Sequence, residues 1–182
     1  MLYNYKDVKE KYKDDYNLKI ALQNKQIFKV EKGVYADKKN PNLLAVYSKK
    51  YPNAIITMDS AFYFYNLTDV IPAKVYLATA SSSHTIDNKK INQIFVKDKI
   101  FNEGRTCEFL ENEKQEIYIY DKERLLIELI RKKKQIPFDY YKEIINNYRE
   151  EVHLLNIHKL EKYASLYSNK DKILETLQME VF

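Results

Sequence analysis

Hydrophobic and polar residues near the amino terminus alternate with the spacing of two short helices. A first helix is predicted from Tyr5 to Tyr12, where apolar residues recur at helical intervals. Asn4 is placed to cap this helix, with Asp7 at the reciprocal position of a capping box. A second helix is predicted from Tyr16 to Asn24, capped by Asp15. The pattern therefore indicates two helices in close succession.

A tight hairpin is predicted directly after the second helix. Ile27 to Val30 reads as a strand, Glu31-Lys32-Gly33 as a turn, and Val34-Tyr35 as the start of the returning strand. Gly33 is free to adopt the positive φ that such a turn requires. A helix followed by a basic hairpin is what a winged-helix DNA reader needs, because one element enters a groove and the other grips the backbone.

The remaining pattern mixes helices and strands. Helices are predicted from Asn40 to Tyr51, Asp59–Tyr65, from Asp121, and at Pro137–Val152, Asn156–Tyr167 and Asp171–Met179. Strands are predicted at Ala54–Thr57, Val75–Thr79, Gln93–Val96, Thr106–Leu110 and Glu116–Tyr120. The predicted fold class is α+β, with an amino-terminal winged helix-turn-helix and a mixed α/β domain that ends in several helices. We place the two domains at residues 1–70 and 71–182.

Charge is distributed unevenly between these parts. Residues 1–50 hold 12 Lys and 6 acidic residues, whereas residues 51–182 hold 19 basic and 20 acidic residues. The whole positive excess of the chain therefore lies in its first quarter, which favours a nucleic-acid face on an amino-terminal module. A lysine-rich surface that is merely solvated is the alternative, and it corresponds to an interaction protein that does not bind DNA.

The candidate DNA contacts lie on the second predicted helix and the hairpin. Gln and Asn side chains can pair with adenine edges in the major groove, and Lys can meet guanine or phosphate. The residues expected to contact DNA are Asn17, Lys19, Gln23, Lys25, Lys29 and Lys32. Gly33 and Tyr35 are expected to shape the turn of the wing.

Several kinds of chemistry lack the residues they need. The chain has 2 Gly, far apart, so it has no phosphate loop or dinucleotide fingerprint. With 1 Cys and 3 His it has neither an intrachain disulfide nor the ligands of a zinc finger. We therefore expect no catalytic residues, no metal and no cofactor. A metal-dependent nuclease or hydrolase remains an alternative, because carboxylates are plentiful.

Four further features have structural interpretations that compete with functional ones. Cys107 lies in a predicted strand and is expected to be a small buried residue, although a nucleophile pair with His84 stays open. Glu113 and Glu116 lie at a predicted hairpin and are expected to be solvated. The basic run Arg131–Lys134 ends a helix, where it complements the helix dipole; a second phosphate-binding patch is the alternative. Tyrosines that recur along the later helices are expected to pack in a core.

The amino terminus has no apolar segment of signal-peptide length, and no run approaches the length of a membrane span. We therefore expect a cytoplasmic protein without membrane contact.

Three separated blocks resemble AbiEi-type antitoxins. The first is Lys29–Asp37, which reads KVEKGVYAD and is similar to the wing of that family. The second is Tyr51–Asp69 and the third is Tyr118–Leu126. The blocks occur in the family's order and cover most of the chain up to about residue 150.

The resemblance implies a function. Proteins of this family have an amino-terminal winged helix that binds promoter DNA and represses its own operon. Their carboxy-terminal domain is needed to oppose a nucleotidyltransferase-like toxin encoded alongside, in a type IV toxin–antitoxin system. In such a system the antitoxin opposes the action of the toxin and does not need to bind it. Such systems act in abortive infection as phage defence. Longer members have a further helix before the first one here, so the helix at Leu43–Tyr51 is expected to take its place.

Overall fold

The computed structural model describes residues 1–182 and has the mixed α+β composition expected from the sequence. The chain forms two compact units. Unit 1 consists of Met1–Ala54 and Cys107–Tyr118, and unit 2 consists of Ile55–Thr106 and Ile119–Phe182. The first boundary between the two units follows Ala54, whereas the predicted domain boundary is near residue 70. The division into a DNA-binding and an antitoxin domain stays a prediction.

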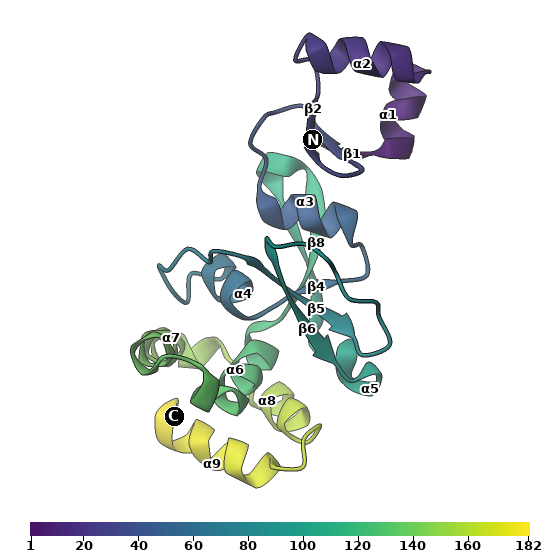
Figure 1. Ribbon diagram of the computed structural model, residues 1–182. Helices are drawn as coiled ribbons and strands as arrows, with labels where there is room; N and C mark the ends of the chain where they lie inside the picture. The colour runs from purple at the N-terminus through teal and green to yellow at the C-terminus, as the bar shows by residue number, and fades with distance from the viewer. The chain divides into compact units, whose positions relative to one another are not determined.

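Unit 1 is built around a three-stranded antiparallel sheet of order β1-β3-β2. Its first elements are β1 (Leu2–Asn4), α1 (Tyr5–Tyr12), α2 (Asp15–Gln23), β2 (Phe28–Glu31), β3 (Val34–Ala36) and α3 (Leu43–Lys50) (Figure 1). The predicted helix pair and hairpin are confirmed within one or two residues. The strand β1 is not predicted, because three residues are too few to show an alternating pattern.

Both faces of this sheet are covered. Successive residues of a strand point to opposite faces, so the central strand β3 separates two clusters. Tyr35 packs with Val8 and Leu18, which belong to α1 and α2. Val34 packs with Ala45 on α3. The helix α3 therefore joins unit 1, but on the face opposite α1 and α2. The expected role of α3 in place of the further helix of longer family members stays a prediction.

Side-chain caps fix where the two first helices begin. Asn4 and Asp7 form the predicted capping box of α1, with Asp7 N–H donating to Asn4 Oδ1 at 2.9 Å. The cap of α2 is Asp14, whose Oδ1 accepts the N–H of Asn17 at 2.7 Å. The prediction of Asp15 as the cap is wrong by one position, and Asp15 is the first helical residue.

The start of α3 depends on a buried carboxylate. Asn42 caps α3, and its own N–H donates to Glu113 Oε1 at 2.8 Å. Lys38 Nζ lies 2.8 Å from the same oxygen, and Glu113 is 3% exposed. The expectation that Glu113 is solvated is therefore wrong, because residues distant in sequence surround it. Leu43, the first residue of α3, is 52% exposed.

A five-stranded sheet has the order β6-β5-β4-β8-β7. Its strands are β4 (Ile55–Ile56), β5 (Val75–Ala80), β6 (Ile91–Val96), β7 (Arg105–Leu110) and β8 (Gln115–Tyr120). Strands β5 and β6 are parallel, and β4 is antiparallel to β5 and parallel to β8. The residues of β7 and β8 between Cys107 and Tyr118 belong to unit 1.

Helices supply most of the core of unit 2. They are α4 (Met58–Phe64), α5 (Asp98–Phe101), α6 (Lys122–Arg131), α7 (Phe138–Glu150), α8 (Ile157–Ala164) and α9 (Lys170–Glu180) (Figure 1). The short α5 is not predicted. Asp121 caps α6 as expected, and every residue from Glu123 to Ile130 is buried. The tyrosine-rich core is confirmed by Tyr141 and Tyr148, which are 2% and 0% exposed. None of the helices has the length and apolarity needed to cross a membrane.

Candidate nucleic-acid interface

The helix α2 presents a mixed polar and aromatic face to solvent. Lys19 and Gln23 are exposed, as predicted, and so are Tyr16 and Ile20, which are 73% and 37% exposed. The four residues have the spacing i, i+3, i+4 and i+7 that defines one side of a helix. Tyr16 and Ile20 were not among the predicted contacts. Their helical spacing from Lys19 and Gln23 is the signal in the sequence that could have identified them.

The opposite side of α2 is anchored in the core of unit 1. Leu18 and Ala21 are buried, and they pack with Ile27 just before β2. Leu22 is partly buried against the same cluster. The exposed face of α2 therefore stands on a packed base that holds its orientation.

Carboxylates occupy the first turn of α2. The side-chain amide of Asn17 donates to Asp14 Oδ2 at 3.1 Å, so it takes part in the helix cap. Asp15 Oδ1 accepts hydrogen bonds from the Lys9 ammonium and the Tyr5 hydroxyl, each at 2.9 Å. Those two donors lower the pKa of Asp15. The positive charge of this surface therefore belongs to the later half of α2 and to the residues that follow.

Lys25 lies at the turn that ends α2. Its φ is 55°, in the left-handed region that glycine most often occupies after a helix. Its N–H donates to Leu22 O at 3.2 Å, and Gln26 N–H donates to Ala21 O at 2.9 Å. The backbone turns sharply here, and the Lys25 side chain is exposed.

The β2–β3 hairpin carries two exposed lysines on a fixed frame. Lys29 and Lys32 are exposed, and Gly33 has a φ of 80° in the turn, as predicted. Tyr35 is 6% exposed and joins the core between the sheet and the first two helices. Glu31 Oε1 lies 3.0 Å from Lys50 Nζ, which ties the hairpin to α3.

Four lysines of unit 1 pair with carboxylates, and the other nine, among them Lys6, Lys13 and Lys39, form no ion pair. The lysines that pair with carboxylates are Lys9, Lys38, Lys49 and Lys50. The four predicted DNA-contact lysines form no ion pair, and they are Lys19, Lys25, Lys29 and Lys32. All four lie on consecutive segments of the chain, from α2 through the hairpin. Their charge is therefore available to an outside partner.

Residues considered for other chemistry do not form a comparable site. Cys107 lies in a strand as predicted, but it is exposed, so the expectation that it is buried is wrong. His84 is exposed in a loop of unit 2. Nowhere in the structure do three or more His, Cys, Asp or Glu side chains gather in a way that could hold a metal ion.

Comparison with known proteins adds no family to this description. No protein-family model matches the chain, and no curated protein matches it. The relation to AbiEi-type antitoxins therefore depends on the three sequence blocks alone.

Proposed function

We propose that this protein is a DNA-binding transcriptional repressor of its own operon and the antitoxin of a type IV toxin–antitoxin system. The observation that carries the DNA-binding part is that every lysine from α2 through the hairpin is exposed and forms no ion pair. By contrast, Lys9, Lys38, Lys49 and Lys50 are neutralised by carboxylates. A cluster of unpaired lysines on consecutive elements is typical of a surface that binds the phosphates of DNA.

The order of elements supports a winged-helix mode of binding. A strand, two helices and a hairpin follow one another, and the strands pair in the order β1-β3-β2. In this proposal α2 enters the major groove while the β2–β3 hairpin lies on the adjacent backbone. Since α3 packs on the other face of the sheet, the unit reads DNA with two helices and a hairpin only.

The exposed face of α2 has groups suited to base recognition. The Gln23 amide can bond an adenine edge, and the apolar surface of Ile20 can contact a thymine methyl group. Lys19 lies on the same face, one turn before Gln23, and can reach guanine or phosphate. The carboxylates of Asp14 and Asp15 would repel phosphate, so we expect the backbone contacts to be made by the later half of α2 and the hairpin.

The test measures binding of the full chain to its own promoter by fluorescence anisotropy from 50 to about 200 mM salt. Lys19→Glu combined with Lys32→Glu should abolish binding, because two attractive contacts become repulsive. The matched control is Lys89→Glu with Lys90→Glu, which makes the same change in net charge at exposed positions of unit 2. Promoter binding by the Lys19/Lys32 variant equal to that of the wild type would rule out the proposed surface.

The antitoxin part of the proposal depends on the family resemblance. It predicts a nucleotidyltransferase-like toxin encoded beside this gene, and it predicts that this protein restores growth when that toxin is expressed. The Lys19→Glu/Lys32→Glu variant should still restore growth, because opposing the toxin does not require promoter binding. A neighbouring toxin whose growth arrest is unchanged by this protein would disprove this part alone.

A further inference from the structure

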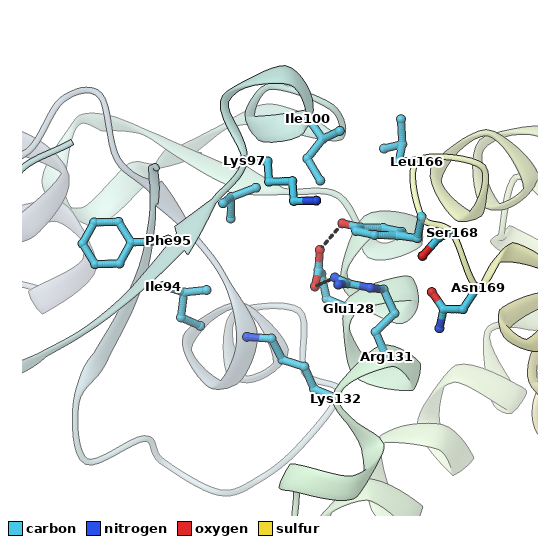
Figure 2. A pocket seen from close by; sticks show the side chains of 12 residues that line it. Ile94, Phe95, Lys97, Ile100, Glu128, Arg131, Lys132, Leu166, Ser168 and Asn169 are labelled. Atoms are coloured by element: carbon cyan, nitrogen blue, oxygen red, sulfur yellow. Dashed lines mark hydrogen bonds and ion pairs between the residues drawn. The ribbon is translucent and has the colours of Figure 1, made fainter. Parts of the chain in front are cut away.

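A hollow in unit 2 has the size of a small-molecule site. Its volume is about 390 Å³, within the range of about 300–1,000 Å³ that is typical of ligand pockets. Its walls come from the end of β6 and the residues after it, from the end of α6, and from the turn between α8 and α9. Figure 2 shows Lys97, Arg131 and Lys132 around this space, together with Ser168 and Asn169.

Positive charge dominates the lining. Lys97, Arg131 and Lys132 line the hollow, and Glu128 is its one carboxylate. Both oxygens of Glu128 accept hydrogen bonds from arginines. Oε2 accepts from Arg131 Nη1 at 2.7 Å, and Oε1 accepts from Arg124 Nη2 at 3.0 Å. Lys97 and Lys132 form no ion pair with any residue. Neither ammonium therefore has a carboxylate within ion-pair distance, and Lys132 feels the charges of Glu128 and Asp59 only from farther away.

The groups behind the hollow add to this excess and hold it in place. Arg124 is 0% exposed, and its Nε and Nη1 have no hydrogen-bond partner. The hydroxyl of Tyr167 donates to Glu128 Oε1 at 2.6 Å, and the Arg131 guanidinium lies 3.5 Å from the centroid of the Tyr167 ring. Glu128 therefore sits between two arginines, and the network carries a surplus positive charge on a rigid frame.

Two further features favour an anion in this space. Burial lowers the pKa of the Lys132 amine, although the charges of Glu128 and Asp59 act in the opposite direction. A bound anion would offset that loss of solvation. The α9 helix, 11 residues long, begins beside the hollow at Asn169, whose side chain makes no capping hydrogen bond. The first backbone N–H groups of α9 are thus not capped by that side chain.

We propose that this hollow binds a small phosphorylated organic molecule, with its phosphate held by Lys97, Lys132 and Arg131. Apolar side chains at the same hollow, among them Ile94 and Leu166, would contact the organic part. This site lies in unit 2 and uses none of the residues of the proposed DNA-binding surface. The two proposals can therefore be tested independently. It gives the basic run Arg131–Lys134 a role in addition to complementing a helix dipole.

The test is isothermal titration calorimetry of the full chain with three probes: inorganic phosphate, adenosine 5′-monophosphate and adenosine. We expect the monophosphate to bind, inorganic phosphate to bind more weakly, and adenosine not to bind. Lys97→Gln with Lys132→Gln removes both charges and leaves polar, unbranched side chains that are one atom shorter. It should weaken monophosphate binding by about tenfold or more, because charge-assisted hydrogen bonds are lost. Lys89→Gln with Lys90→Gln, at exposed positions that do not line the hollow, should bind as the wild type does.

Several results would overturn the proposal. They are the absence of binding by both phosphate-bearing probes at millimolar concentration, equal binding by the Lys97/Lys132 variant, and equal binding of adenosine and its monophosphate. Binding of a single-stranded oligonucleotide through these lysines without any binding of the monophosphate would also overturn it, since the hollow would then serve a nucleic-acid backbone. The Lys97→Gln variant alone, altered at an exposed position, keeps the test valid if the double variant does not fold.

Discussion

The two units of this protein use their basic residues in opposite ways. On unit 1, Lys19 and Lys32 are exposed and have no acidic partner, so nothing in the fold depends on their charge. In unit 2, Arg124 is fully buried, and it bonds to Glu128 and lies against the rings of Tyr120 and Tyr167. We infer that the charge of these exposed lysines can be removed with little effect on folding, whereas charge in the core of unit 2 is part of the fold.

The largest expected effect is that of Glu128→Gln. This change leaves Arg124 buried without a carboxylate, and losing one partner of a buried ion pair costs about 3–5 kcal/mol. The free energy of unfolding should fall by that amount in urea denaturation. Glu175→Gln, at an exposed position of α9, is the matched control and should change stability little. A loss below about 1 kcal/mol, the typical value for a surface pair, would mean that Arg124 does not depend on Glu128.

The chain's two glycines sharpen the comparison, because both have a φ of 80° but different surroundings. A Cβ at Gly104 would lie 2.5 Å from Arg124 Cβ, whereas a Cβ at Gly33 would meet nothing within 4 Å. Gly33→Ala should therefore cost only the backbone strain, about 1–2 kcal/mol. Gly104→Ala should cost about 1–3 kcal/mol more, for overpacking against a buried side chain.

Thermal or urea unfolding of the two alanine variants checks this difference directly. Equal losses of stability would show that Arg124 moves aside without cost, and that the core of unit 2 is looser than its packing suggests.

A smaller effect is expected where unit 1 does bury a charge. Glu113 accepts from the Asn42 N–H and pairs with Lys38. Glu113→Gln keeps the shape and one acceptor but removes the ion pair, so stability should fall by about 1–3 kcal/mol. The matched control is Glu116→Gln, an exposed position in the same hairpin. If both variants unfold at the same urea concentration, Glu113 does not fix the start of α3.

Much of the fold could be predicted from local pattern. The capping box of Asn4 and Asp7, the turn at Gly33 and the cap of α6 at Asp121 each depend on residues within a few positions of one another. Such signals are readable in a single sequence. The elements that carry the candidate DNA contacts were predictable for the same reason, because α2 and the hairpin are contiguous, and the contacts themselves stay a prediction.

The remaining features depend on partners far apart in the sequence. Glu113 is buried because Lys38 and Asn42 come to it from more than 70 positions away. The strand β1 exists only through its pairing with β3. Arg124 and Glu128 look like the polar side of an amphipathic helix, but other helices cover that side as well. A pattern of polar residues cannot indicate a surface that the tertiary fold closes.

The smallest expected effect on stability is that of Lys25→Gly, and it separates charge from fold most cleanly. Lys25 has a φ of 55°, so glycine suits the backbone and the variant should unfold within about 0.5 kcal/mol of the wild type. Its promoter affinity should fall, and the dependence of log affinity on log salt should become shallower by about 0.9, the value for one phosphate contact. Lys39→Gly, which also removes an exposed lysine of unit 1 but lies outside α2 and the hairpin, should leave that slope unchanged. If both variants lowered the slope equally, unit 1 would attract DNA through its overall charge rather than through α2 and the hairpin.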